Sequence, residues 1–230
     1  MIEEPPLLII QSQRNGPTRQ QLQALSGTPT GFIADAMRGQ GALPSFIHHV
    51  SPETLPTRMC GRILTVSCGP ADVLAVFAGL GEVQADDIMI AATGQWSGSA
   101  VIGDRVMGML KNAGGQGFVT DGLVRDVEGI RDVGLPLMCA GVSPNSPYAS
   151  GPGEIGTPIQ LGEVSICSGD VLVSDIDGAV VVPVDRLDAV IASLDTIREL
   201  ETSLDQEVAN GLIMPESTRE LLDSARVIRI

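Results

Sequence analysis

Between residues 61 and 140, short apolar runs alternate with stretches whose apolar positions recur at helical spacing. Strands are predicted at 61–66, 87–92, 117–120 and 135–140. Helices are predicted at 71–79, 102–113 and 126–132. Strands and helices that alternate at such short intervals favour β-α-β units, in which neighbouring strands run parallel.

The segment before this region has a different pattern. Residues 1–17 are predicted to form an arm, and Asn15-Gly16-Pro17 interrupts the chain at its end. Thr18 can cap a short helix that carries Leu22 and Leu25. A second short helix is predicted from Thr30 to Met37 and is ended by Gly39.

After residue 140 the pattern changes again. A loop rich in proline, glycine and serine covers 141–156, and short β-branched runs follow at 163–167, 171–174 and 179–183. Gly169-Asp170 and Asp177-Gly178 are turn residues of the hairpin type. A long helix is predicted at 184–210 and a last one near 216–226. The chain is therefore predicted to have an arm (1–17), one α/β domain (18–211) and a helical tail (212–230).

The charge of the chain narrows the classes of partner. The sequence has 28 acidic and 14 basic residues, a formal net charge of −14. Phosphate backbones and anionic lipid would repel such a chain, so binding to nucleic acid or to a membrane surface is not expected. Lys111 is the only lysine, so it is the one candidate for Schiff-base chemistry.

No apolar run approaches the ~18 residues that a membrane-spanning helix needs. The start of the chain lacks the positive region of a signal peptide. The cysteines show no C-x-x-C spacing and are expected to be buried, reduced thiols rather than zinc ligands or disulfides; they are Cys60, Cys68, Cys139 and Cys167. We therefore expect a soluble cytoplasmic protein.

Several common kinds of site find no support. His48 and His49 are adjacent, so on a strand they would face opposite ways and could not form a metal pair. No G-x-S-x-G elbow, dinucleotide fingerprint or P-loop is present. Asp175-Ile176-Asp177-Gly178 matches the start of a calcium loop but lacks the later ligands, so a hairpin turn is favoured.

The most informative stretch covers 117–126. An apolar strand leads to Asp121-Gly122, and Arg125 and Asp126 then stand where a helix is expected to begin. In open α/β sheets ligands bind beyond the carboxyl ends of the strands. Arg125 can donate to a carboxylate or a keto oxygen, and Asp126 is one hard ligand for a divalent cation. A helix cap that forms only a surface ion pair explains the same two residues equally well.

A second candidate element is Gly103-Asp104. These residues can open the helix that reaches Lys111, and the backbone N–H groups of Arg105 and Val106 would then attract a carboxylate. An aspartate that caps the helix without any ligand is the alternative.

Several motifs together resemble those of a known family. The most specific strings are Asp121-Gly122-Leu123-Val124-Arg125-Asp126, read as D-G-x-V-R-D, and the G-D-x-x-x-x-D-x-D-G-x-x-x-x-P pattern that begins at Gly169. Further shared segments lie at 33–36, 61–66, 85–89 and 103–104. The chain resembles the RraA-like family, which joins 4-hydroxy-4-methyl-2-oxoglutarate aldolases to regulators of RNase E activity and was formerly labelled dimethylmenaquinone methyltransferase. The resemblance spans roughly residues 25 to 211.

The resemblance implies a β/β/α swivelling (phosphohistidine-like) fold in an α/β domain, assembled as trimers or pairs of trimers with sites at subunit interfaces. In the aldolases, the counterpart of Asp126 holds a divalent metal, Mg²⁺ or Mn²⁺. The counterpart of Arg125 binds the keto oxygen of the substrate. The amides of Arg105 and Val106 would hold the carboxylate, and Asp104 would order a water. The family pattern places the acidic residue of the neighbouring subunit at Glu201.

Three departures from the family pattern concern the substrate. The aldolases usually carry leucines where this chain has Arg105 and Val106, and an asparagine that contacts substrate where this chain has Val73. Binding through backbone amides tolerates such changes, but the far end of the substrate can differ. An exposed Arg105 would favour a second carboxylate.

The leading hypothesis is a class II, metal-dependent aldolase or decarboxylase that releases pyruvate from 4-hydroxy-2-oxo acids or oxaloacetate. Arg125 would stabilise the enolate, and a water near Asp104 and Glu201 would accept the hydroxyl proton. The rival hypothesis is a non-catalytic regulator that binds an RNase E-type enzyme. An inert scaffold ranks last, and no glycine loop supports a methyltransferase.

Overall fold

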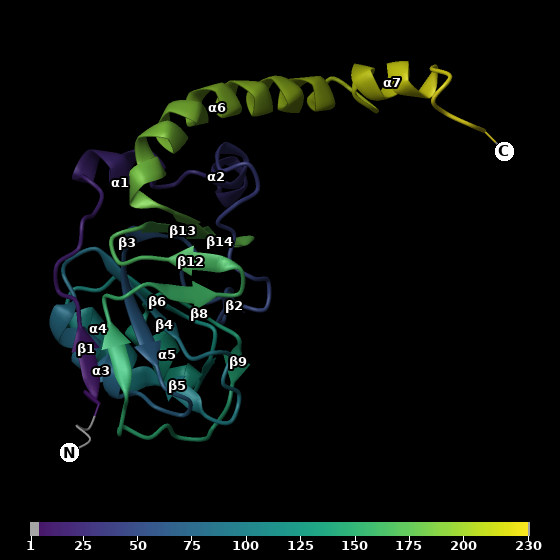
Figure 1. Ribbon diagram of the computed structural model, residues 1–230. Helices are drawn as coiled ribbons and strands as arrows, with labels where there is room; N and C mark the ends of the chain where they lie inside the picture. The colour runs from purple at the N-terminus through teal and green to yellow at the C-terminus, as the bar shows by residue number, and fades with distance from the viewer. Residues whose placement is uncertain (1–4, 230) are drawn as a thin grey trace.

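A central sheet organises the computed structural model, which describes residues 5–229 (Figure 1). Within these residues nine strands form the sheet, with the order β1-β10-β3-β4-β6-β8-β2, and β13 pairs with both β3 and β14. The bounds of these strands are β1 Leu8–Ile10, β2 His48–His49, β3 Met59–Cys68, β4 Asp87–Ala92, β6 Gly117–Thr120, β8 Leu137–Cys139, β10 Gly153–Ile155, β13 Val171–Asp175 and β14 Gly178–Val182.

The middle of the sheet is parallel. β3 pairs with β4, β4 with β6, and β6 with β8, all in parallel. Most residues of these strands are buried, and β4, β6 and β8 are buried throughout, as expected for strands covered on both faces. The predicted parallel β-α-β arrangement is therefore confirmed.

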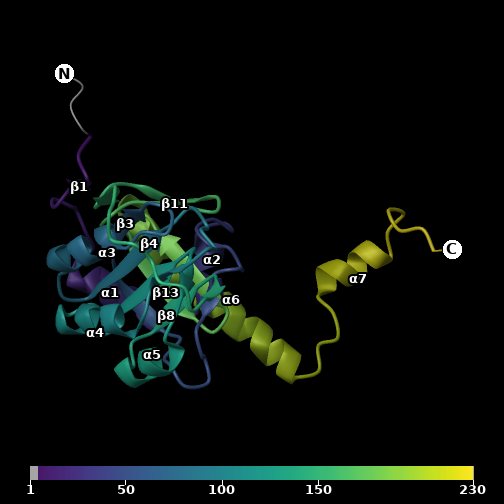
Figure 2. The same ribbon diagram turned by 90° about the horizontal axis from the view of Figure 1, so that it is seen from below.

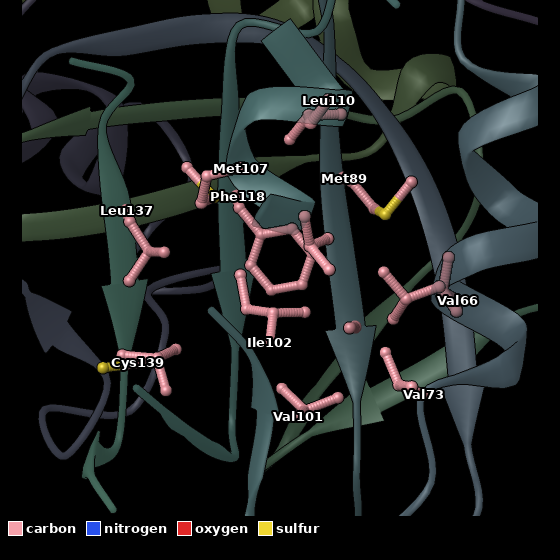
Figure 3. Close-up of a cluster of buried hydrophobic side chains, with 14 of the residues drawn as sticks. Val66, Val73, Met89, Val101, Ile102, Met107, Leu110, Phe118, Leu137 and Cys139 are labelled. Atoms are coloured by element: carbon pink, nitrogen blue, oxygen red, sulfur yellow. The ribbon is translucent and has the colours of Figure 1, made fainter. Parts of the chain in front are cut away.

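Helices cover one face of these strands. They are α3 (Leu74–Gly79) with the 3-10 turn η1 (Leu80–Glu82), α4 (Asp104–Asn112) and α5 (Val127–Val133). Between them and the sheet lies a cluster of buried side chains centred on Phe118, Met89 and Met107 (Figure 3). A second apolar cluster, which includes Ile63, Ile90 and Val119, lies on the opposite face.

A small parallel sheet lies beyond the carboxyl ends of the central strands. It has the order β5-β7-β9, with β5 at Ala100–Ile102, β7 at Leu123–Val124 and β9 at Gly141–Val142. The prediction that residue 102 begins a helix was wrong, because Ile102 ends β5 and the helix begins at Asp104. This small sheet carries the segments that lead into α4 and α5.

Two hairpins follow the long loop. β13 and β14 pair with Asp175 opposite Gly178, so the predicted turn at this motif is confirmed. The hairpin expected around Gly169-Asp170 was wrong, because β12 (Val164–Ile166) pairs with β11 (Ile159–Leu161) and β13 pairs with β3. The Asp170 carboxylate instead accepts hydrogen bonds from the N–H groups of Cys167 and Val184 and so fixes the crossing.

The segment expected to be an arm contributes to the sheet. β1 pairs in parallel with β10 at the edge, and the Arg14 guanidinium is buried against the Asp87 carboxylate. The helix α1 (Arg19–Leu25) begins with a capping box of Thr18 and Gln21. The Asp175 carboxylate accepts from the Thr30 N–H at 2.8 Å and from its Oγ1 at 2.7 Å, which caps α2 (Thr30–Ala36).

The long helix α6 (Leu187–Ala209), preceded by the 3-10 turn η2 (Val184–Arg186), leaves the body of the domain and is followed by α7 (Glu216–Leu222) (Figures 1 and 2). Leu187, Val190 and Leu194 are buried, whereas Leu204 and Val208 on its distal half are exposed. The predicted long helix is confirmed, and the last helix is shorter than predicted. Among residues 5–229, no helix is both long and apolar enough to cross a membrane.

The cysteines are free thiols, and three of them lie in the interior or partly buried. Burial raises the pKa of the Cys60 and Cys139 thiols to about 11 and that of Cys68 to about 12. Cys167 is exposed, so the expectation that it is buried was wrong. It follows β12 in the connection that Asp170 holds, outside the apolar clusters.

Candidate active site

The site begins with a buried carboxylate at the end of β6. Asp121 Oδ1 accepts hydrogen bonds from the N–H and Oγ1 of Thr93 at 2.6 and 2.9 Å, and Oδ2 accepts from the Gln95 N–H at 2.9 Å. Asp121 is only 3% exposed. It therefore ties the loop after β4 to the loop after β6, at the sheet edge where α/β proteins bind ligands. The sequence placed Asp121 in the motif but did not reveal this role.

Arg125 and Asp126 follow β7, and several contacts fix them. The Arg125 N–H donates to the Ile102 carbonyl at 3.0 Å. Its Nε lies 3.2 Å from Asp126 Oδ2, and its Nη1 donates to Ser146 Oγ. The side chains are 34% and 46% exposed, so both remain within reach of a ligand. Ser146, in the long loop, is a site residue that sequence reasoning missed, because it lies in a run of loop residues with no spacing signal.

Asp126 has a strained backbone. It stands at the N-cap of α5 with φ of 57° in the left-handed region, which costs a non-glycine residue roughly 1–2 kcal/mol. Its carboxylate makes no side-chain cap hydrogen bond, so capping does not explain why an aspartate stands here. The surface ion pair with Arg125 is present. Strain that local capping does not account for is a feature of functional sites.

The other half of the site is the start of α4. Gly103 is the N-cap and Asp104 the first helical residue, so Asp104 is not the cap itself. Asp104 Oδ1 accepts the Arg105 N–H at 2.7 Å, which means that this amide already has an acceptor. Val106 is buried, and its N–H lies in the first turn, where no intrahelical acceptor exists. The Arg105 side chain is exposed and has no ion pair within residues 5–229.

The starts of α4 and α5 fit together through two glycines. A Cβ at Gly103 would lie 2.6 Å from Asp126 Oδ2 and 3.1 Å from Arg125 Cγ. A Cβ at Gly129 would lie 2.5 Å from Asp104 Oδ2. Each carboxylate therefore packs against the backbone of the opposite helix, and Asp104, Arg125 and Asp126 gather at one point.

The metal-binding side chains at this site suit a divalent ion that keeps most of its waters rather than one that the protein coordinates fully. Within residues 5–229 no group of three or more histidine, cysteine, aspartate or glutamate side chains could enclose a metal. Asp126 offers a half-exposed carboxylate. A single hard oxygen ligand is compatible with Mg²⁺, which usually keeps several waters. The residues present therefore fit an ion held by one carboxylate, waters and donors from outside this chain or from substrate.

Two other residues singled out from the sequence lie elsewhere. Glu201 is on α6, which packs against α1 and α2 and leaves the body on the side opposite β5 (Figure 1). This chain alone does not bring Glu201 to Arg125, so its action across a subunit interface stays a prediction. Lys111 donates to the Val133 carbonyl at 2.6 Å, about 10 Å along α4 from Asp104, as expected from its place beyond the site.

The histidines form no site of this kind. As predicted, they face opposite ways on β2, with His48 exposed and His49 buried. His49 Nε2 donates to the Asp175 carbonyl at 2.6 Å. Burial lowers the pKa of His49, although that hydrogen bond opposes the shift. A cavity of about 460 Å³ next to these residues is lined mainly by apolar side chains and contains neither Arg125 nor Asp126.

Comparison with known proteins supports the resemblance. The family model described as RraA-like, Aldolase/RraA, matches residues 30–181. A protein of Halalkalibacterium halodurans, with the provisional name 4-hydroxy-4-methyl-2-oxoglutarate aldolase, is 34% identical over 155 residues, which are 67% of this chain and 72% of the relative.

Solved structures agree on the fold. RraAS2 of Streptomyces coelicolor, described as an unusual member of the RNase ES inhibitor RraA family, has a TM-score of 0.73 and 26% identity, over 83% of this chain and 99% of that one. A Geobacillus kaustophilus protein, described as S-adenosylmethionine:2-dimethylmenaquinone methyltransferase, shares the fold with a TM-score of 0.61 and 22% identity, over 67% and 94% of the two chains. The mixed α/β fold with its long C-terminal helix thus matches RraA-like structures, and the chain belongs to the RraA-like family.

Proposed function

We propose that this protein is a class II, divalent-metal-dependent aldolase that releases pyruvate from 4-hydroxy-2-oxo acids, with oxaloacetate decarboxylation as a related reaction. The observation that carries the proposal is the pairing of Arg125 and Asp126, both accessible, against the side-chain-free surface of Gly103. The relative with the aldolase name supports the same chemistry.

The reaction requires the negative charge that develops on the C2 keto oxygen of the substrate to be stabilised. When the C3–C4 bond breaks, its electron pair moves to C3 and on to the C2 keto oxygen, while the C4 hydroxyl loses its proton and becomes a carbonyl. Protonation of C3 then gives pyruvate. The Arg125 guanidinium supplies donors that are already oriented by Ser146 and Asp126, and preorganised donors of this kind stabilise a developing oxyanion strongly.

The proton of the C4 hydroxyl needs an acceptor. Asp104 is partly exposed, and its Oδ2 faces the backbone of Gly129. It can order a water that receives the proton, with Glu201 of a second copy of the chain as the other carboxylate. The substrate carboxylate would bind at the first turn of α4, where the N–H of Val106 lies and where the N–H of Arg105 would exchange its bond to Asp104.

Asp126 would hold the metal, Mg²⁺ or Mn²⁺, and the bound ion would supply positive charge to the same oxyanion. The measurement that tests the proposal is pyruvate release from 4-hydroxy-4-methyl-2-oxoglutarate and from oxaloacetate, with Mg²⁺ or with EDTA. We expect turnover with Mg²⁺ and its loss with EDTA. Release of no pyruvate from either compound by the metal-loaded protein would refute the proposal.

Gly103→Ala is expected to lower kcat/KM by about 10²-fold, because its Cβ would displace the Asp126 carboxylate and the Arg125 side chain. Steady-state kinetics and the melting temperature would be measured together. Gly108→Ala, on the same helix, is the matched control, since its Cβ would meet only Val133 Cγ2 at 4.0 Å. Equal kinetics for the two variants would show that the packing at Gly103 does not matter.

Subunit mixing tests the role of Glu201. Inactive Asp126→Ala and Glu201→Ala proteins, allowed to exchange subunits, should regain activity, because some sites would then have both native residues. Mixtures of Asp126→Ala with Arg125→Ala should stay inactive, since both residues belong to the same chain's half of the site. If the first mixture stays inactive despite exchange, Glu201 does not act across an interface.

A regulator of an RNase E-type ribonuclease is the second candidate function. It is favoured by the similarity to RraAS2 and by the exposed apolar residues on the distal half of α6. Binding to such a ribonuclease with inhibition of RNA cleavage, together with no pyruvate release, would favour this function over the aldolase.

A further inference from the structure

Exposed aromatic side chains lie in two segments that border the site. The chain has few aromatic residues: four Phe, one Trp and one Tyr. The single tryptophan, Trp96, is 41% exposed, and the single tyrosine, Tyr148, is 73% exposed. Trp96 belongs to the loop after β4, and Tyr148 lies two residues after Ser146, which contacts Arg125.

Trp96 connects to the site through consecutive contacts. Its indole packs over Gly98, where a Cβ would lie 2.6 Å from Cζ2, and its Nε1 donates to Ser99 Oγ at 3.2 Å. The Gly98 carbonyl accepts from Asn145 Nδ2 at 3.0 Å. Asn145 precedes Ser146, whose Oγ accepts a hydrogen bond from the Arg125 guanidinium. The loop segment that contains Asn145 and Ser146 therefore links the Trp96 indole to Arg125. The turn that carries it is built on the Asp121 carboxylate.

Tyr148 stands on the other side of Ser146. Its N–H donates to the Ala71 carbonyl at 2.7 Å, and its carbonyl accepts from the Val73 N–H at 2.8 Å. The backbone of Tyr148 is thus fixed while its ring remains exposed. Val73 itself is only 4% exposed and belongs to the buried cluster in Figure 3, so of the two side chains only the Tyr148 ring is open to a ligand.

From this arrangement we propose that Trp96 and Tyr148 are specificity-determining residues, and that the preferred substrate carries an apolar, aromatic group at C4. The proposal rests on the proposed function, because it takes the carboxylate and keto oxygen to bind at α4 and Arg125. A substrate ring that packs on the indole or on the phenol removes apolar surface from water, and paired aromatic rings attract each other further. A small or charged C4 group would gain nothing from either ring.

Three 2-oxo acids that lack the C4 hydroxyl, and so cannot be cleaved, separate binding from turnover. They are 2-oxo-4-phenylbutanoate, 2-oxopentanoate and 2-oxoglutarate, which present a phenyl, a methyl and a carboxylate group at C4. Isothermal titration calorimetry, in which each compound is added to the intact protein in the presence of Mg²⁺, gives the Kd of that compound. We expect the phenyl compound to bind at least tenfold more tightly than the methyl compound and to change the fluorescence of Trp96.

The variants assign the preference to residues. Trp96→Ala and Tyr148→Ala should each reduce the advantage of the phenyl compound severalfold, while the Kd of 2-oxopentanoate stays within twofold. Trp96→Phe should keep most of the advantage, which separates loss of the ring from loss of folding. Phe46→Ala is the control, because Phe46 is also exposed but lies in the loop before β2.

The outcomes distinguish this proposal from the function on which it rests. A preference for the phenyl compound without pyruvate release from any substrate would support the role of Trp96 and Tyr148 in binding and would refute the aldolase function. Pyruvate release combined with tighter binding of 2-oxoglutarate than of the phenyl compound would support the aldolase function but refute the role of Trp96 and Tyr148. The preference for a carboxylate would then be assigned to Arg105. Equal loss of all three ligands in both Trp96 variants, or no binding of any of them, would overturn the proposal.

Discussion

Replacement of Arg125 by alanine is expected to lower kcat/KM for pyruvate release by on the order of 10²-fold or more, with most of the loss in kcat. The guanidinium is held by Asp126 on one side and by Ser146 on the other, so it reaches the substrate already oriented. Its donors gain strength as charge develops on the keto oxygen, and removing them therefore affects the transition state more than the ground state. Steady-state kinetics with saturating Mg²⁺ would measure the effect.

Two variants control this prediction. Arg125→Lys keeps the charge but loses the planar set of donors, so we expect it to recover only part of the activity. Ser146→Ala removes one contact of the guanidinium and should have a smaller effect than either Arg125 variant. Wild-type kinetics for Arg125→Ala would remove this residue from the mechanism.

Arg14→Ala is expected to lower the free energy of unfolding by about 3–5 kcal/mol, the largest effect on stability that we predict. The Asp87 side chain is fully buried and contacts Arg14, Arg62 and the Gln84 N–H, and Arg14 itself is 4% exposed. Arg14 also donates to the carbonyls of Ile63 and Glu82 at 3.2 Å. Its removal would leave the buried Asp87 carboxylate with less positive charge beside it. Asp87 and the carbonyls of Ile63 and Glu82 would each lose a hydrogen-bond donor.

Urea denaturation would measure this loss. The control is Arg131→Ala, because Arg131 lies 3.7 Å from Glu53 with both side chains largely exposed, and surface pairs contribute only about 0–1 kcal/mol. If the two variants lose similar stability, the contact of Arg14 with Asp87 does not hold the N-terminal segment to the domain.

The sequence predicted the core of the fold well, for a local reason. The strands β3, β4, β6 and β8 are mainly apolar runs, and glycines stand at or just after the ends of α4 and α5, so the signal lies within each segment. The hairpin expected at Gly169-Asp170 failed because a turn signal does not specify which strands pair. Pairing is decided by partners distant in the sequence, here β13 with β3.

The same distinction explains what could be predicted of the site. Arg125, Asp126 and Asp104 stand in motifs at the ends of strands, and the structure brings them together. Ser146 and the buried Arg14 could not be found from the sequence, because they act on residues 21 and 73 positions away. Asp121 stood inside the motif, but its role depends on the loop after β4, which only the folded chain places beside it.

The central claim is that Asp126 and a divalent ion are needed together for pyruvate release. The most direct test measures the rate of pyruvate formation from 4-hydroxy-4-methyl-2-oxoglutarate as Mg²⁺ is raised from zero, for the native protein and for Asp126→Ala at matched concentrations. We predict saturable activation of the native protein and no activation of the variant. Activity that persists in EDTA, or that Asp126→Ala retains in full, would contradict the account.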